Sequence, residues 1–325
     1  MRVFVAGATG AIGARLAPQL VERGHEVIST SRSERKAAGL RAQGAEAVVL
    51  DVLDREAVRK AVLAARPHAI VHQATALADL SDFKNFDRSF AQTNRLRVEG
   101  TDALLAAARE AGVGRFVGQS YAGWPYARVG GPVKTEEDPL DPTPVAAMSE
   151  TLAAIRHLEE AAVGAGGIAL RYGGFYGSPE DAQLELVRKR RFPIVGDGGG
   201  VWSFVHLDDA AAATVLALER GEPGIYNVVD DEPAPVREWL PALAAAIGAK
   251  PPRRVPRLLA RLLAGESGVV LMTESRGASN AKAKRELGWT LRYPSWRGGF
   301  RAAYGRMGAA AGGGAATLAL GRSSG

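Results

Sequence analysis

The residues best suited to chemistry stand near the start of the chain, where three glycines have the spacing G-x-x-G-x-x-G. They follow a strand-like apolar run at residues 3–6, and a helical pattern begins near residue 12. Glycines between a strand and a helix permit a tight turn and let the backbone approach a pyrophosphate, which the N–H groups of the helix N-terminus bind. The residues of this predicted dinucleotide-binding loop are Gly7, Ala8, Thr9, Gly10, Ala11, Ile12 and Gly13.

The end of the second predicted strand, residues 26–30, indicates which dinucleotide binds. A site for NAD places a carboxylate there to accept a hydrogen bond from the ribose 2′-hydroxyl. No acidic residue occupies this turn; Ser31 stands in the place of the acid and Arg32 follows it. A guanidinium beside hydroxyl groups suits a 2′-phosphate, so we expect NADP, unless Arg32 is an ordinary solvated turn residue. Asp51 and Val52, after the third strand, are placed to meet the adenine.

These groups need a scaffold of parallel strands, and the first half of the chain has the pattern of one. The apolar runs that alternate with helical patterns cover residues 3–6, 26–30, 45–50, 69–72, 115–120 and 168–172. Strands that alternate with helices predict a doubly wound parallel Rossmann sheet, with ligands at the carboxyl ends of its strands. Between the fourth and fifth strands, the pattern predicts one helix over residues 94–111.

The length of the chain favours one large domain and a smaller lobe. We expect residues 1–178 to form the NADP-binding domain, with residues 201–229 packing back on it. Residues 179–200 and 230–304 are expected to form a smaller C-terminal substrate-binding lobe. From residue 305 to residue 325 the chain is rich in Gly and Ala and has no periodic apolar face, which predicts a disordered tail.

Composition excludes several kinds of chemistry and of partner. The chain has 325 residues and no cysteine, so disulfides and thiolate catalysis are excluded. No histidines have metal-ligand spacing, so we expect no metal. Because no leader-like or membrane-spanning apolar run occurs, we expect a cytoplasmic protein without a membrane partner. The net charge of +6 includes a basic run at residues 188–191. This run is either a solvated face or a site for an anionic substrate, and without interleaved aromatics it does not predict nucleic-acid binding.

Further segments carry a family likeness through their order and spacing. They cover residues 71–75, 94–101, 115–120, 170–177, 204–210, 226–228 and 287–289. Together with the glycine loop, they resemble the extended short-chain dehydrogenase/reductases, the group of NAD-dependent epimerases and dehydratases, over roughly residues 1–300. The resemblance implies a Rossmann fold and an NAD(P) cofactor, and it puts Ser120 in the place of the catalytic serine. The cofactor contacts that it implies are Gln73, Ala74, Thr75, Asn94, Ser120, Tyr172, Gly173 and Phe175.

The chain departs from that family where the family moves its proton. There a tyrosine exchanges the proton and a lysine four residues later, on the same helix face, lowers its pKa. Met148 and Leu152 take these positions here, and none of the seven tyrosines has a lysine four residues later. Tyr121 or Tyr126 is a candidate replacement acid, with Lys134 as the cation. Alternatively, these aromatic residues wall an apolar substrate pocket.

Three functions follow from these observations. The first is an NADP-dependent oxidoreductase that transfers hydride to or from a small carbonyl or enone, with Ser120 and one tyrosine polarising the substrate. The second is a catalytically silent NADP-binding sensor or scaffold. The third is a nucleotide-sugar epimerase or dehydratase, which ranks last because that chemistry needs the missing tyrosine. The expected partner is a small-molecule substrate, and a homodimer through paired helices is compatible with the fold.

Overall fold

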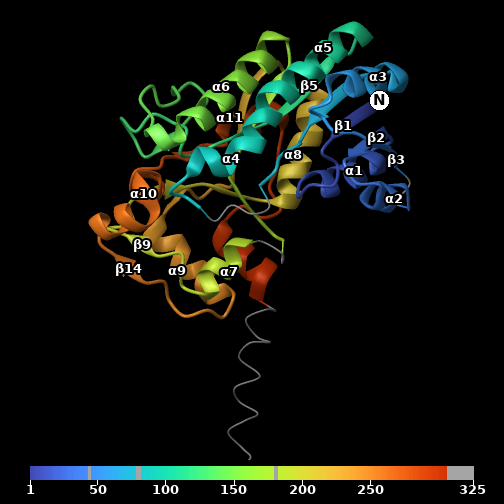
Figure 1. Ribbon diagram of the computed structural model, residues 1–325. Coiled ribbons are helices and arrows are strands. Elements are labelled where there is room, and N and C mark those ends of the chain that lie inside the picture. The colour runs from blue at the N-terminus through green and yellow to red at the C-terminus, as the bar shows by residue number, and fades with distance from the viewer. Residues whose placement is uncertain (43–44, 78–81, 179–181, 306–325) are drawn as a thin grey trace, which may run out of the picture.

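The computed structural model describes residues 1–42, 45–77, 82–178 and 182–305 (Figure 1). At its centre is a seven-stranded parallel sheet with the strand order β12-β7-β5-β4-β1-β2-β3. Its strands are β1 (Arg2–Ala6), β2 (Glu26–Ser31), β3 (Glu46–Val49), β4 (Ala69–His72), β5 (Arg115–Tyr121), β7 (Ile168–Tyr172) and β12 (Gly224–Val228). The doubly wound α/β fold expected from the alternation of strands and helices is confirmed.

Helices cover both faces of the sheet because its strands are apolar on both sides. Within β1, Val3 and Val5 belong to one core cluster, whereas Phe4 and Ala6 belong to the other. The first layer contains α1 (Gly13–Glu22), α2 (Glu34–Ala42), α8 (Leu207–Arg220) and α11 (Ala281–Leu287). The second layer contains α3 (Arg55–Ala65), α5 (Thr101–Ala111) and α6 (Ser149–Gly164). Before α6, Ala146–Met148 form a short 3₁₀ turn.

The connection between β4 and β5 differs from the single helix predicted over residues 94–111. It consists of α4 (Phe86–Arg95), a π-helical turn at Leu96–Gly100, and α5. The turn lies close to the sheet, since a Cβ on Gly100 would be 3.0 Å from Val52 Cγ1. His72 Nε2 lies 3.1 Å from the Leu96 carbonyl oxygen. Burial lowers the pKa of His72 to about 4, so the neutral imidazole donates to that carbonyl at neutral pH.

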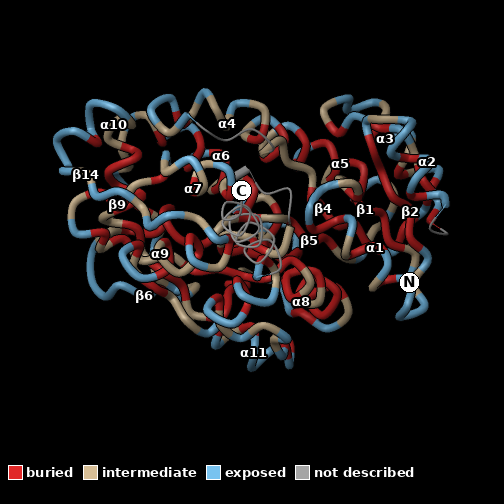
Figure 2. Tube along the Cα trace, turned by 90° about the horizontal axis from the view of Figure 1, so that it is seen from below, coloured by how far each residue is buried: buried red, intermediate tan, exposed pale blue. Residues whose placement is uncertain are grey.

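A second group of elements packs at the carboxyl side of the sheet around its own aromatic core. This core includes Phe192, Trp239, Trp296 and Phe300, and Figure 2 shows buried segments in both this lobe and the sheet. The helices of the lobe are α7 (Ala182–Arg188), α9 (Val236–Ala246) and α10 (Arg257–Thr273). Its strands pair as β9 (Ile194–Val195) with β14 (Arg254–Val255) and β10 (Val201–Trp202) with β13 (Ala234–Pro235).

Two more pairs of short strands connect the lobe to the sheet. They are β8 (Gly174–Tyr176) with β11 (Phe204–His206), and β6 (Val133–Lys134) with β15 (Gly277–Ala278). Residues 296–305 are helical, and the rest of the expected tail, residues 306–325, lies outside the described residues. Across the described ranges, no helix combines the length and the apolar character that crossing a membrane requires.

Candidate functional site

The glycine loop connects β1 to α1 and makes a cradle that side chains would fill. Gly7 has φ +88°, a conformation that favours glycine, and a Cβ there would lie 2.6 Å from the backbone nitrogen of Ala74. At Gly13 a Cβ would lie 2.4 Å from the Gly7 carbonyl oxygen. Gly10 and Ala11 are exposed at the rim, whereas Ala8 and Ile12 are buried beneath the loop and Thr9 is half-buried. The open N-terminus of α1 and this close backbone approach fit a dinucleotide pyrophosphate.

The carboxyl ends of β2 and β3 form the neighbouring edge of this site. Ser31 ends β2 and its hydroxyl accepts a hydrogen bond from the Ser33 backbone nitrogen, at 3.2 Å. Arg32 is exposed, and its guanidinium has no ion pair or hydrogen bond with any residue that the structure describes. Asp51 is exposed as well, whereas the side chain of Val52 is buried against Gly100. The edge therefore presents a cation to a ligand where an NAD-preferring site presents an acid.

The polar side chains at the ends of β4 and β7 turn toward the core. Gln73 Nε2 donates to the Tyr172 hydroxyl at 3.1 Å, and that hydroxyl lies 2.7 Å from Thr214 Oγ1 on α8. Both Gln73 and Tyr172 are buried, so among the expected cofactor contacts their side chains have structural partners already. Ala74 lies against the glycine loop through its backbone.

Three other expected contacts follow these strands. Thr75 and Phe175 are half-buried, and the Phe175 ring packs 5.5 Å from that of Tyr172. Gly173 lies so close to the neighbouring chain that a Cβ would be 2.6 Å from the Ser203 carbonyl oxygen. These three residues lie at the sheet edge that adjoins the glycine loop.

Ser120 and Tyr126 belong to one buried polar network. Ser120 Oγ donates to Glu159 Oε1 at 2.5 Å, and Glu159 forms a bidentate ion pair with Arg171, at 2.7 and 2.6 Å. The Tyr126 hydroxyl accepts from Arg171 Nη1 at 3.1 Å and donates to Asn227 Oδ1 at 2.6 Å. All five side chains are buried. The structure thus places the proposed catalytic serine and one of the proposed tyrosines in a buried network that joins β5, β7, β12 and α6, in which both hydroxyl protons are already donated within the protein.

The positions of the family's tyrosine and lysine are filled by core residues. Met148 and Leu152 are each 1% exposed and pack in an apolar cluster with Phe86, Trp124 and Leu271. This packing leaves an apolar side chain, with no proton to donate, at each of the two positions.

The start of α6 is held by α4 instead. The Asp87 carboxylate accepts from the backbone nitrogens of Glu150 and Thr151 and from the Thr151 hydroxyl, at 2.6–3.0 Å. A carboxylate at a helix N-terminus is favourable because it satisfies free N–H groups. Asn94 Nδ2 donates to Thr151 Oγ1 at 3.0 Å, so Asn94 braces α6.

Tyr121 is the remaining tyrosine candidate, and it contacts the apolar cluster directly. Burial raises its pKa to about 12, and the charge of Arg97 opposes that rise. At neutral pH the phenol is therefore protonated and can donate a hydrogen bond. Lys134 is not free to assist it, because its ammonium group donates to the Val129 carbonyl and pairs with Asp138 at 3.0 Å.

Arg97, in the π-helical turn, is a functional candidate that the sequence reading missed. It is 6% exposed, its Nε has no hydrogen-bond partner in the described chain, and its guanidinium lies 5.9 Å from the Phe90 ring centroid. Burial lowers its pKa to about 10, so it stays charged at neutral pH. The nearby carboxylate of Glu159 is paired with Arg171, which leaves the Arg97 charge uncompensated among the described residues. Such a cation stabilises negative charge that arrives in the site.

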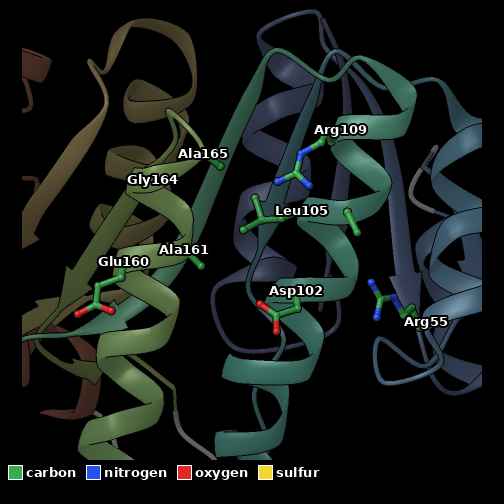
Figure 3. Close-up of a pocket in the computed structure, with 9 residues that line it drawn as sticks. Arg55, Asp102, Leu105, Arg109, Glu160, Ala161, Gly164 and Ala165 are labelled. Atoms are coloured by element: carbon green, nitrogen blue, oxygen red, sulfur yellow. The ribbon is translucent and has the colours of Figure 1, made fainter.

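Two hollows have room for a small molecule. One, of about 420 Å³, lies between Phe83 and the outer lobe and is lined by Phe192, Trp202 and Leu271. The other, of about 440 Å³, is a groove between α5 and α6 (Figure 3). In that groove Asp102, Leu105 and Arg109 of α5 face α6, and none of the predicted site residues lines it. The described ranges bring no three His, Asp or Glu side chains together in a way that could hold a metal ion.

Comparison with known proteins agrees with this geometry. The model of the NAD dependent epimerase/dehydratase family matches residues 3–228. The chain is 44% identical over 307 residues to a 3-diazoavenalumate denitrifying reductase from Streptomyces sp, which covers 92% of this chain and 99% of that relative. It is 34% identical over 268 residues to a 2-alkyl-3-oxoalkanoate reductase from Stenotrophomonas maltophilia, covering 77% of this chain and 76% of that one.

A solved structure extends the likeness to nearly the whole chain. The UDP-glucose 4-epimerase of Thermus thermophilus, determined in complex with NAD, superposes with a TM-score of 0.71 at 26% identity. The superposition covers 96% of this chain and 100% of that one. The family and this neighbour thus support a nicotinamide dinucleotide as the cofactor of this chain.

The buried network yields a prediction about Ser120 and Tyr126. Ser120→Ala and Tyr126→Phe should each lower the free energy of unfolding by about 1–3 kcal/mol, because each leaves a buried partner without its hydrogen bond. Tyr121→Phe is the matched control, since its hydroxyl makes no hydrogen bond with the described residues, and it should leave thermal stability unchanged. Thermal and urea unfolding measure both effects. If the Ser120→Ala variant instead has normal stability and no activity, Ser120 has a catalytic role.

Proposed function

Because the chain belongs to the NAD-dependent epimerase/dehydratase family, we propose that it is an NADPH-dependent reductase whose reaction needs no proton from a Tyr–Lys pair. It is an NAD(P)-dependent oxidoreductase, and its cofactor is a nicotinamide dinucleotide. The observation that carries the proposal is the burial of Met148 and Leu152 in the apolar cluster. A site built to shuttle protons would not replace both groups with side chains that cannot ionise.

The missing proton donor restricts the chemistry. When bound, the reduced nicotinamide supplies hydride. Hydride addition to a carbonyl carbon leaves an alkoxide that must gain a proton. In reductive loss of an aryl diazonium group, by contrast, a C–H bond forms, the C–N bond breaks, and its electron pair leaves with dinitrogen. This reaction consumes no proton, so it proceeds even though Met148 and Leu152 cannot donate one.

The favoured substrate class is therefore a small aromatic compound with a diazo group. The Streptomyces relative is named as a denitrifying reductase of such a compound, and it is 44% identical to this chain. The site offers an apolar, water-poor wall around Met148 and Leu152, which suits this chemistry. This wall also favours flat, conjugated ring systems.

A small carbonyl or enone is the second candidate substrate. The relative from Stenotrophomonas maltophilia, named as a reductase of a 3-oxoalkanoate, favours it. In that reaction the proton has to come from the protonated phenol of Tyr121 or from water. Ser120 and Tyr126 have no part in this step, because the buried network already uses their hydroxyl groups.

The cofactor is proposed to be NADP on the strength of Arg32. This arginine is exposed beside the end of β2, next to Ser31 and Ser33, and has no partner within the described ranges. A 2′-phosphate would supply the missing anion, whereas NAD would leave the guanidinium without a ligand.

A homodimer is a further part of the proposal. The groove between α5 and α6 has small residues on its α6 side, Ala161, Gly164 and Ala165, which permit close approach of a second copy (Figure 3). Light scattering on the purified protein should give twice the mass of one chain, and Ala161→Arg should reduce it to one. A single-chain mass for the unchanged protein would remove the dimer from the account.

The choice of dinucleotide is tested at Arg32. Arg32→Ala should weaken NADPH binding by about tenfold to a hundredfold and leave NADH binding nearly unchanged, since one charged contact to phosphate contributes about 1.5–3 kcal/mol. Titration of nicotinamide fluorescence measures both affinities. Arg35→Ala, one turn into α2, is the control for a general loss of positive charge. Equal weakening of NADPH and NADH would contradict the assignment to a 2′-phosphate.

The reaction is tested with three substrates and NADPH: an aryl diazonium salt, an aryl ketone and an aryl enone. We expect consumption of NADPH with equimolar release of dinitrogen from the diazonium compound, and slower or no reduction of the other two. Tyr121→Phe should leave the first reaction intact and slow any ketone reduction by about a hundredfold. Reduction of the ketone alone would move the assignment to a carbonyl reductase. Binding of NADPH with no turnover of any of the three would favour the sensor or scaffold.

A further inference from the structure

The pocket of about 420 Å³ lies beside the segment that precedes α4, where the outer lobe meets the Rossmann domain. Its walls are mostly aromatic and aliphatic: they include Phe83, Phe192, Trp202, Leu271 and Met272. A volume of this size fits a small molecule with one ring and a short chain. None of the residues expected from the sequence to hold the cofactor lines it, so a dinucleotide leaves it free.

The pocket is pre-shaped for a flat ligand. The Phe83 and Phe192 rings are stacked with centroids 6.1 Å apart, and Phe192 packs edge-on against Trp202 at 6.3 Å. Trp202 is held in place because its Nε1 donates to the Leu271 carbonyl oxygen at 2.8 Å. Rings fixed in this way offer apolar faces to a conjugated chain without a further loss of side-chain entropy.

The basic run at residues 188–191 contributes one free cation to this pocket. Arg188 and Lys189 both pair with Glu185, and Arg190 Nε donates to the Pro251 carbonyl oxygen. Arg191 alone lines the pocket, and its guanidinium has no partner in the chain as described. In the basic run, three side chains are therefore held by ion pairs or hydrogen bonds, and the side chain of Arg191 is available to a ligand.

Lys84 lies at the same pocket, exposed and without an ion pair among the described residues. The one carboxylate there, Asp82, accepts hydrogen bonds from the backbone nitrogens of Lys84 and Asn85 and from Asn85 Nδ2, at 2.8–3.2 Å. These bonds occupy Asp82 in ordering the turn before α4. The mouth of an apolar slot thus has two cations without ion pairs and one carboxylate, a net positive charge that suits an anionic group at the end of an apolar ligand.

This pocket also adjoins the reaction site. A smaller hollow lined by Tyr121, Ala122 and Gly123 shares Trp202 and Leu271 with it. That smaller hollow has a volume of only about 10 Å³, and Trp202 and Leu271 form the wall between the two. An elongated molecule that reaches from the basic mouth to the end of β5 must therefore displace the Trp202 ring. Its reacting ring would lie near Tyr121 and its other end near Arg191.

From this arrangement we propose that the pocket binds the distal part of the substrate, and that the substrate is an elongated conjugated carboxylic acid whose carboxylate pairs with Arg191 and Lys84. The proposal rests on the proposed reductase function for the reacting end of the molecule. It adds the substrate class and assigns Arg191 as a specificity-determining residue. A nucleotide diphosphate would share the anionic chemistry, but the aromatic slot has few polar groups for a ribose or for a second phosphate.

The test measures binding and needs no turnover. Trans-cinnamate, methyl cinnamate and UDP are titrated separately into the full-length protein with NADP⁺ present, and the quenching of tryptophan fluorescence is followed. We expect cinnamate to bind at least about tenfold more tightly than its ester, because the ester has no charge for the two cations. Weaker binding of cinnamate than of UDP would replace the carboxylic acid with a nucleotide. Equal binding of acid and ester would overturn the role of the charge.

A matched pair of variants then locates the charge. Arg191→Ser should weaken cinnamate binding by about tenfold and leave the ester unchanged, whereas Lys189→Ser removes the same charge from the same run and should change neither. If both variants weaken cinnamate binding equally, the basic run acts only through its overall positive charge, which contradicts a specific site at Arg191. If the protein binds cinnamate more tightly than its ester but reduces none of the three test substrates, the pocket is supported and the reductase function is contradicted. Reduction of the diazonium compound without discrimination at Arg191 would do the reverse.

Discussion

The candidate site depends first on the close approach of the Gly7 backbone to that of Gln73 and Ala74. A single carbon atom added at Gly7 would lie within 2.7 Å of three backbone atoms, and Gly13 is packed as closely against the same loop. This contact brings the ends of β1 and β4 together and directs the N-terminus of α1 toward the opening between them. The other candidate groups, from Arg32 just after β2 to Tyr121 at the end of β5, are arranged along the edge that it defines.

Two buried arginines, Arg171 and Arg97, lie behind this edge and differ in whether a carboxylate neutralises them. Arg171 is neutralised by Glu159 and in turn holds Tyr126, so the pair contributes to stability and takes Ser120 out of reach of a substrate. Arg97 has no such partner among the described residues and stays charged next to the aromatic cluster. A buried, uncompensated cation costs stability, so its presence indicates a use in binding or in chemistry. The same site thus has no proton relay, which suits hydride acceptors whose reduction releases a leaving group.

The sequence was sufficient for the fold and for the tight glycine turn between β1 and α1, because both depend on local patterns: alternating apolar runs and the glycine spacing after the first strand. It was not sufficient for the direction of side chains. Ser120 pairs with a carboxylate 39 residues away, and Tyr126 with an amide 101 residues away, and no spacing rule connects them. One signal was available: Glu159 lies on the same face of α6 as Leu152 and Ile155, and a charge on an apolar helix face indicates a buried pair. The position of Arg97 depended on the π-helical turn, which the helical pattern does not distinguish from a continuous helix.

The central claim is that hydride transfer here proceeds without a proton from the protein. The most direct test follows the origin of the new hydrogen: the aryl diazonium compound is reduced with NADPH deuterated at the transferring position, in ordinary water, and the reaction is repeated with unlabelled NADPH in deuterated water. The account predicts one deuterium on the carbon that lost nitrogen in the first case, none in the second, and equal rates for unlabelled NADPH in ordinary and in deuterated water. Solvent-derived hydrogen on that carbon, or a much slower reaction in deuterated water, would contradict it.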